Sequence, residues 1–458
     1  MTVGIVPVGS GESQLTELRR KSGLGRQELA RGAVTARILG RHGLRLLVER
    51  APDQTVSARA AAELREAFTE LGPTYVKLAQ LVASSPGLFP QVLAEELRGL
   101  LDNAPPVPLT QVRSVLLAEL GAQPEELFAS FDPEPLAAAS IAQVHAATLP
   151  DGRDVVVKIQ RPDICDRIDA DLQLLTQAAR LLSRTSLARF ADTPGMVDDA
   201  AATLLGELNF MREARSMEHF GRLLSADAAS CGVRVPAVEW PLTTARVLTM
   251  ERIRGTVVDD VRLADTHDVV ELLRRGVGAW LRELLRSGFF HADVHAGNLM
   301  VDVDGDVVFL DFGAVGQLSS AARAGLRDTL PALLFRSDYD SAARLLGELT
   351  GDTALPFEAI AADLASTIAP QLAEPCPSYG QLLISVLRVG ARHGAAAPRD
   401  LVLVGKQLLY FERYVRLLAP DWSLLTDPLL ADVLLPSAPQ APAAVPAVGP
   451  ARFTQESP

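Results

Sequence analysis

The sequence predicts an α+β fold in which a helical extension comes first, a small β-containing part follows, and a helical part ends the chain. Residues 56–71 place apolar side chains at helical spacing, which predicts an amphipathic helix. Residues 151–160 (DGRDVVVKIQ) join a turn dipeptide to a β-branched run, as in the second half of a β-hairpin. From residue 318 to about residue 419 the pattern is helical throughout. The strands are therefore expected in the middle of the chain.

The composition is that of a globular protein of a reducing compartment. Of the 458 residues 48% are hydrophobic, which allows a large core and two or more structural units. The net charge of −12 argues against a nucleic-acid binder, because phosphate contacts need clustered Lys and Arg. Cys165, Cys231 and Cys376 have neither metal-site nor disulfide spacing. With no signal-peptide pattern and no apolar run of about 18 residues, we expect a cytoplasmic protein without a transmembrane helix.

In the extension, helices are separated by Gly and Pro. Gly72-Pro73 ends one helix and starts the next, because proline suits a first helical turn. The expected helices are one or two within 15–48, then 56–71, 73–84, 91–102 and 109–120.

The middle of the chain carries two hairpin signals. Asp151-Gly152 is the expected turn of a strand–turn–strand unit that begins at residue 135. Asp304-Gly305 is a second two-residue turn between short strands. We expect helices at about 163–184 and 197–220 between the two hairpins.

Four separated sites together indicate phosphoryl transfer. Lys158 ends the strand run VVVK, and Glu213 is expected in the middle of a helix. Asp293 and Asn298 are five residues apart in HADVHAGN, and Asp311 begins DFG thirteen residues later. In phosphoryl transfer such a lysine neutralises the nucleotide phosphates, and the glutamate holds the lysine in place. The first aspartate orients or deprotonates the acceptor hydroxyl. The asparagine and the second aspartate supply hard oxygen ligands to Mg²⁺. The order and spacing are strong evidence, whereas DFG alone would be weak.

A metal centre is the alternative interpretation of the stretch GFFHADVHAGNLM. His291 and His295 are four residues apart, as in zinc-binding helices. However, the stretch contains a glycine, and no third ligand stands near in the sequence. We expect His291 to hold the loop backbone, and His295 either to do the same or to contact phosphate or metal.

With these residues placed, the chain resembles the UbiB (AarF/ADCK-like) family of atypical kinases. The resemblance is carried by LGPTYVKLAQ (71–80), PLAAASIAQVHAATLPDGRDVVVKIQRP (135–162), GELNFMREA (206–214), GFFHADVHAGN (288–298) and LDFGAVG (310–316). It implies a protein-kinase-like two-lobed fold with a small mixed β N-lobe, a helical C-lobe and an α-helical N-terminal extension. It also implies binding of ATP or ADP with Mg²⁺. Glycines cover the phosphates in ordinary kinases, whereas an alanine-rich loop occupies that turn here, with residues Ala137, Ala138, Ala139 and Ser140.

The resemblance also assigns nucleotide and regulatory residues. Met250 and Glu251, in the stretch RVLTMERIRG, are expected beside the adenine. The family's KxGQ motif corresponds to Lys77 and Gln80, in a helix that packs over the active site.

The sequence departs from the family's motifs at several positions. The ExD motif corresponds to Glu207 and Asn209, and Asn209 replaces a charged aspartate. Ala79 replaces the KxGQ glycine, and Val294 and Ala296 replace prolines.

We expect five segments. These are a flexible N-terminus (1–12), the helical extension with KLAQ (13–120), the N-lobe (121–255), the C-lobe with catalytic loop and DFG (256–432) and a disordered Pro/Ala-rich tail (433–458).

The expected function is that of an Mg²⁺-dependent atypical kinase or ATPase, which the resemblance connects to isoprenoid-quinone or other lipid metabolism. No long activation segment follows DFG, so a peptide substrate is disfavoured. The alternatives are a small-molecule phosphotransferase of the aminoglycoside-kinase type, a non-catalytic nucleotide-gated scaffold or lipid chaperone, and, least favoured, an ordinary protein kinase. A lipid or quinone precursor is the expected partner. Residues 399–420 form either a core helix or a helix lying on an anionic membrane surface.

Overall fold

The computed structural model describes residues 25–48, 56–83, 91–98, 104–183, 193–350, 354–374, 377–395, 399–424 and 427. The expected flexible N-terminus and Pro/Ala-rich tail lie outside these residues. Among the described helices, none has both the length and the apolar character needed to cross a bilayer. The chain divides into two compact units, Met1–Asp260 with His291–Val315, and Val261–Phe290 with Gly316–Pro458.

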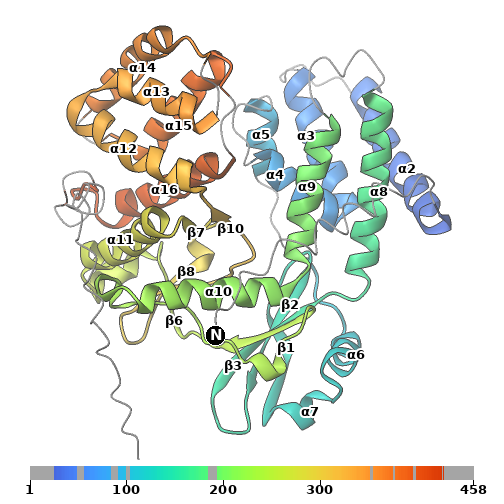
Figure 1. Ribbon diagram of the computed structural model, residues 1–458. Coiled ribbons are helices and arrows are strands. Elements are labelled where there is room, and N and C mark those ends of the chain that lie inside the picture. Colours follow the sequence, from blue (N-terminus) through green and yellow to red (C-terminus); the bar gives the residue numbers. More distant parts are fainter. Residues whose placement is uncertain are drawn as a thin grey trace, which may run out of the picture. The chain divides into compact units, whose positions relative to one another are not determined.

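The first unit contains a bundle of helices that forms the extension and part of the middle of the chain (Figure 1). Its members are α2 (Arg26–Val48), α3 (Val56–Leu71), α4 (Pro73–Ala83), α5 (Gln91–Arg98), α8 (Ile164–Leu182) and α9 (Thr193–Glu207). Ile38, Leu71 and Tyr75 share one buried apolar cluster, which joins α2, α3 and α4. The predicted break at Gly72-Pro73 is confirmed, and Gly72 has a φ of +93°, which residues other than glycine rarely adopt.

A four-stranded antiparallel sheet lies beside this bundle in the same unit. Its strands are β1 (Ser130–Ala138), β2 (Ala142–Thr148), β3 (Asp154–Gln160) and β5 (Val247–Glu251), in the order β1-β2-β3-β5. The predicted turn is confirmed, because Gly152 has a φ of +90° between β2 and β3.

Alternation along β3 places its side chains on two faces. Val157 and its neighbours on one face are buried against α6 (Leu109–Leu120), close to the short helix α7 (Pro124–Leu127). Lys158, one residue on, points to the opposite face. There α10 (Phe210–Ser225) packs through Phe210 and Ala214.

A second small sheet completes the first unit. Its strands are β4 (Val233–Arg234), β9 (Val307–Phe309), β8 (Leu299–Asp302) and β6 (Gly255–Val257), in the order β4-β9-β8-β6. Gly305, with a φ of +84°, lies in the predicted turn between β8 and β9. The strands β7 (Phe289–His291) and β10 (Val315–Gln317) pair with each other. Short 3-10 helices are η2 (Ala228–Ser230), η3 (Trp240–Leu242), η4 (Val261–Asp265) and η5 (Ala296–Asn298).

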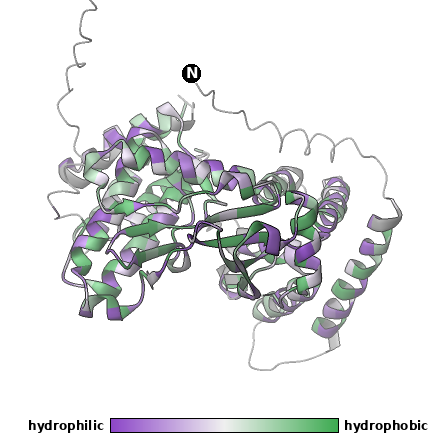
Figure 2. Ribbon diagram, turned by 90° about the horizontal axis from the view of Figure 1, so that it is seen from below, coloured by the Kyte–Doolittle hydropathy of each residue, from purple (hydrophilic) through white to green (hydrophobic). Residues whose placement is uncertain are grey.

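The second unit is helical, as the pattern after residue 318 predicts. It contains α11 (Val269–Arg286), α12 (Ser320–Arg336), α13 (Tyr339–Thr350), α14 (Phe357–Leu372), α15 (Tyr379–Arg392) and α16 (Arg399–Leu418). Its helices carry hydrophobic and hydrophilic residues side by side (Figure 2). Trp280 lies against both Phe290 and Phe411, with ring centroids 5.8 and 5.5 Å apart. Since Phe411 and Tyr414 are buried, α16 is a core helix of this unit.

One predicted helix is interrupted. The sequence predicts a continuous helix over 197–220, but α9 ends at Glu207 and α10 begins at Phe210. The prediction that Glu213 lies mid-helix is therefore wrong: it lies in the first turn of α10. The break is stabilised from outside, because Gln160 donates to the carbonyl of Leu208 and the N–H of Phe210 donates to the carbonyl of Ala245.

Candidate active site

Lys158 is the centre of the candidate site. Its Nζ lies 2.9 and 3.0 Å from the two carboxylate oxygens of Glu213, and 3.3 Å from Oδ2 of Asp311. The ammonium also stands over the Phe210 ring, 5.1 Å from its centroid. Strand β3, helix α10 and the DFG segment thus meet at one cation, as in the predicted constellation.

The electrostatics follow from this crowding. Burial by itself lowers the pKa of Lys158, but the carboxylates of Asp311 and Glu213 outweigh it and hold the pKa above its ordinary value. Burial raises the pKa of Glu213 to about 7, although Lys158 acts in the opposite direction. Partial desolvation raises the pKa of Asp311, but Lys158, the Gly313 N–H and Lys77 outweigh it, so this pKa lies below its ordinary value. Asp311 is therefore ionised at neutral pH.

The backbone at DFG is held in an uncommon conformation. Asp311 has a φ of +51°, and its Oδ1 accepts a hydrogen bond from the Gly313 N–H at 3.1 Å. Phe312 is 1% exposed and packs against Phe220 of α10 and the His291 ring, with centroids 5.4 and 4.7 Å apart. The helix that carries Glu213 and the segment that carries Asp311 are thus packed together.

The loop around Asp293 is held by His291. The buried His291 ring donates from Nε2 to the carbonyl of Leu310 at 2.7 Å and accepts the Asp293 N–H at Nδ1, 3.1 Å away. Burial lowers the pKa of His291. Both ring nitrogens are used, so this histidine holds the loop backbone as expected and is not a metal ligand. Nε2 of His295 lies 3.7 Å from Oδ2 of Asp293.

Asn298 lies in η5 at the end of the same loop and is 8% exposed. Its side-chain Nδ2 donates to the carbonyl of Asp293 at 3.0 Å. Its own carbonyl accepts the N–H of Leu310, one residue before Asp311. The amide orientation makes Oδ1 the atom of Asn298 that can ligate a cation.

The KLAQ helix reaches this site. Lys77 Nζ lies 3.1 Å from the Glu207 carboxylate, and Lys77 is one of the groups that lower the Asp311 pKa. Asn209 is extended, with a φ of −121°, and precedes α10; its buried Oδ1 has no hydrogen-bond partner among the described residues. Gln80 is half-buried on α4. The regulatory roles of these four residues remain predictions.

The alanine-rich loop is the turn between β1 and β2. Ala137 and Ala138 end β1, and the Ala139 N–H donates to the carbonyl of Ala142. Arg161 fixes the loop by donating from Nε to the Ala139 carbonyl at 2.8 Å. Ser140, at the tip of the turn, is 5% exposed.

The QVH part of the same stretch forms a buried polar chain. His145, 0% exposed, donates from Nδ1 to the Asp132 carbonyl at 2.8 Å and accepts from Gln143 Nε2 at 2.7 Å. Oε1 of Gln143 accepts the N–H of Val107, in the segment before α6. The chain therefore connects β1, β2 and the end of the extension.

We expect His145→Ala to lower the free energy of unfolding by about 3 kcal/mol, because it leaves buried partners unsatisfied and opens a cavity. Burial lowers the pKa of His145 below its ordinary value of 6.5, so the stability that this residue confers is present above pH 6.5 and is lost as the pH falls below it. Urea unfolding of wild type and variant at several pH values measures both effects. The matched control is His267→Ala, at a partly exposed histidine, which should change stability by at most about 0.5 kcal/mol. Equal losses in the two variants would contradict the role of the buried chain.

The two residues expected at the adenine differ in surroundings. Met250 borders the apolar cluster formed by β5 and α10. The Glu251 carboxylate is held by Arg234 through two hydrogen bonds of 3.0 and 2.9 Å. Arg234 also binds Asp302 of β8 at 2.9 Å. Arg234 could not be predicted from the sequence, because nothing in its local pattern points to partners on β5 and β8.

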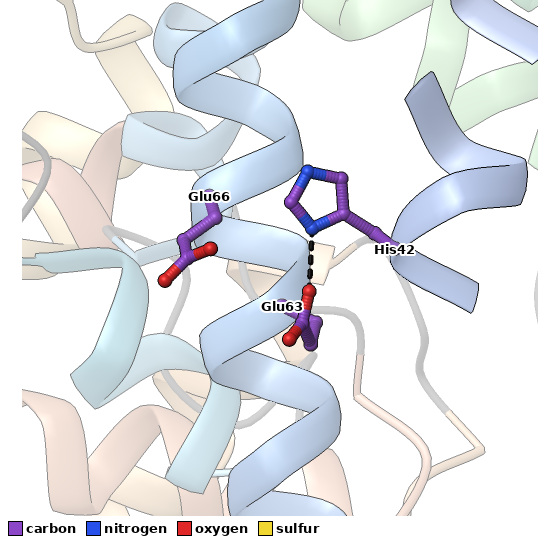
Figure 3. Close-up of side chains that lie close together, drawn as sticks. All are labelled: His42, Glu63 and Glu66. Carbon is purple, nitrogen blue, oxygen red and sulfur yellow. Dashed lines mark hydrogen bonds and ion pairs between the residues drawn. The ribbon is translucent and has the colours of Figure 1, made fainter. Parts of the chain in front are cut away.

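A different group of residues could hold a metal ion in the described part of the chain. His42 of α2 faces Glu63 and Glu66 of α3 (Figure 3). His42 Nδ1 already lies 2.5 Å from Glu63, and Arg45 lies 3.4 Å from Glu66. Arg45 and His42 therefore already bind these carboxylates, and the group is an ion-pair network between α2 and α3.

Comparisons with known proteins agree with this arrangement. The model of the ABC1 atypical kinase-like domain matches residues 99–346, and that of the UbiB helical domain matches residues 377–423. An uncharacterized protein of Mycobacterium tuberculosis is 41% identical over 88% of this chain and 84% of its own length. A protein of Marinobacter nauticus named "Probable protein kinase UbiB" is 36% identical over 81% of this chain and 69% of its own length.

A solved structure is also similar. It is that of Rv3197 of Mycobacterium tuberculosis in complex with erythromycin, with a TM-score of 0.50 and 27% identity, covering 79% of this chain and 96% of that one. The first unit combines the antiparallel sheet, the Lys158–Glu213 pair, the loop of Asp293 and Asn298, and DFG, which are the parts of a kinase-like α+β fold. The chain therefore belongs to the UbiB (AarF, ABC1) family of atypical kinase-like proteins.

Proposed function

We propose that this protein binds ATP with Mg²⁺ and acts as an ATPase or atypical kinase in isoprenoid-quinone or other lipid metabolism. The observation that carries the proposal is the position of the Lys158 ammonium between Glu213 and Asp311. A cation on a rigid strand, held by a buried carboxylate, can neutralise nucleotide phosphates without reorganising.

The other residues of the site support the same chemistry. Asn298 and Asp311 offer the amide and carboxylate oxygens that Mg²⁺ prefers, and the lowered pKa keeps Asp311 charged. When bound with the nucleotide, the ion would neutralise charge on its phosphates. Asp293 is half-buried, its loop is held by His291, and we assign it the orientation or deprotonation of the attacking hydroxyl.

The acceptor is proposed to be water or a small, lipid-linked molecule rather than a protein. Between Gly313 and the start of α12 at Ser320 the chain forms only the short strand β10. This leaves no segment that could form a platform for a peptide. The connection to quinones or other lipids rests on the family, in which the relatives carry the name UbiB.

The test is ATP hydrolysis by the purified full-length chain, with Mg²⁺ or EDTA, in the presence or absence of anionic liposomes or a quinone-head-group mimic. We expect turnover that needs Mg²⁺ and increases severalfold with liposomes or mimic. Turnover of added small alcohols instead of water would support a small-molecule phosphotransferase. Nucleotide binding without turnover under every condition would contradict the proposal and favour a nucleotide-gated scaffold.

A further inference from the structure

A cavity lies in the first unit, beside the alanine-rich loop. It has a volume of about 730 Å³, within the range of sites that bind small molecules. Its walls come from the end of α3, the start of α4, the segment before α6, Ser140 and the first turns of α8. Lys158, Glu213, Asp293, Asn298 and Asp311 are not among the residues that line it.

Two guanidinium groups in the cavity wall converge on one carbonyl oxygen. Arg31 of α2 and Arg167 of α8 both donate from an Nη2 atom to the carbonyl of Leu71, at 2.6 and 2.8 Å. Asp171 neutralises Arg31, which it binds at 2.6 and 3.0 Å, and it also accepts from Thr74 at 2.7 Å. Arg31 thus has the fully buried Asp171 carboxylate as its counter-ion.

Arg167 is the more exposed of the two guanidinium groups. Among the described residues its side chain has the Leu71 carbonyl as its hydrogen-bond acceptor and forms no ion pair. Partial burial and the nearby Arg31 lower the pKa of Arg167, although Asp171 acts in the opposite direction. Asp163 and Asp166 also line the cavity, but neither pairs with Arg167. Arg167 is therefore the guanidinium of this wall with no carboxylate within ion-pair distance among the described residues.

The backbone is shaped to admit this guanidinium. A Cβ on Gly72 would lie 2.5 Å from Nη2 of Arg167, so any other residue here would displace this guanidinium from its present position. Gly72 is also the residue that separates α3 from α4, and its φ of +93° suits glycine for a second reason.

The rest of the lining is largely apolar. It includes Val76, Pro105, Val107, Pro162 and Ile164. We propose that this cavity binds an oxyanion carried on an apolar body, with a phosphate or carboxylate at Arg167 and Arg31 and the apolar part along these side chains. An oxyanion would form an ion pair with Arg167 and bind its guanidinium group through two hydrogen bonds.

The position of the cavity connects such a ligand to the nucleotide site. Arg161, another lining residue, donates to the carbonyls of Ala139 and Pro105, so it ties the alanine-rich loop to the cavity wall. Pro73, also in the wall, begins the helix that carries Lys77. Occupation of the cavity should therefore change how tightly nucleotide is held.

Calorimetry on the full-length chain tests the binding site without relying on turnover. The probes are octyl phosphate, inorganic phosphate, octanol and vesicles of dioleoyl phosphatidylglycerol. We expect octyl phosphate to bind at least tenfold more tightly than inorganic phosphate or octanol, because it uses both the cations and the apolar lining. Vesicle binding that depends on Arg167 would identify a lipid head group as the source of the oxyanion, whereas binding of octyl phosphate alone would identify a free amphiphile.

Two variants and a matched control locate the site. Arg167→Gln should weaken octyl phosphate binding tenfold or more, and Thr69→Glu, at an exposed lining residue of α3, should do the same by repulsion. Arg37→Gln, at an exposed arginine of α2 outside the cavity, has the same charge change as Arg167→Gln and should leave binding unchanged. If Arg167→Gln fails to fold, the affinity of Thr69→Glu for octyl phosphate tests the proposal on its own. Equal affinity in wild type, Thr69→Glu and Arg167→Gln would overturn the proposal, as would octyl phosphate binding no more tightly than inorganic phosphate.

Discussion

Asp311→Asn should reduce Mg²⁺-dependent ATP turnover by a factor of about 10²–10³, the range found when one preorganised charged or hydrogen-bonding group is removed from a transition state. Asp311 is half exposed at the site, is ionised, and touches Lys158 at 3.3 Å. Asparagine keeps the size of the side chain but supplies no negative charge to a divalent ion. The measurement is kcat together with the Mg²⁺ concentration needed for half-maximal rate, which should increase.

The matched control for this variant is Asp304→Asn. Asp304 is exposed in the turn between β8 and β9, seven residues before Asp311 in the same segment. It should leave kcat and the Mg²⁺ requirement unchanged. If Asp311→Asn kept wild-type turnover while the thermal unfolding of the protein was unchanged, the assignment of Asp311 to the metal would be wrong.

Glu213→Gln should lower kcat/KM for ATP about 100-fold at pH 8 and should remove a pH dependence centred near 7. Burial raises the pKa of Glu213 to about 7, so in wild type the carboxylate that holds Lys158 forms as the pH rises through this value. Wild-type kcat/KM should therefore increase from pH 6 to pH 8. The profile of the variant should be flat over this range, because an amide does not titrate.

The raised pKa of Glu213 also makes the free energy of unfolding depend on pH. Since the pKa of Glu213 in the folded protein is raised above the ordinary value of 4.5, the folded state binds the extra proton between pH 4.5 and 7. The stability that Glu213 confers is present below pH 4.5 and is lost as the pH rises through 7.

The control for the rate profile of Glu213→Gln is Glu218→Gln, at an exposed glutamate of the same helix, which should retain the wild-type rate profile. An unchanged profile in Glu213→Gln would refute the assignment of the titration to this residue.

Local patterns were enough to predict much of the fold. The glycines at 152 and 305 have the positive φ values that the two turn dipeptides require, and Gly72 separates two helices as predicted. These predictions succeed because a turn or a helix start depends on residues next to each other in the chain. The helical pattern after residue 318 succeeds for the same reason, since a helix buries a stripe that its own sequence encodes.

The order of the motif residues also carried information beyond local structure. Lys158 and Glu213 are 55 positions apart and Lys158 and Asp311 are 153 apart, yet they meet. The distances between these residues along the sequence do not by themselves say that the side chains meet in the fold. They were predictable because phosphoryl transfer requires a lysine, a glutamate and two aspartates of this kind, in this order.

Only the tertiary structure decided the features that depend on partners far away in the sequence. The break between α9 and α10 exists because Gln160 and Ala245 satisfy backbone groups at residues 208 and 210. The sequence by itself thus predicted the turns, most of the helices and a set of residues that meet at one place. The folded chain decided how Arg31 and Arg167 share the Leu71 carbonyl, because a shared acceptor arises from packing between segments that no local pattern connects.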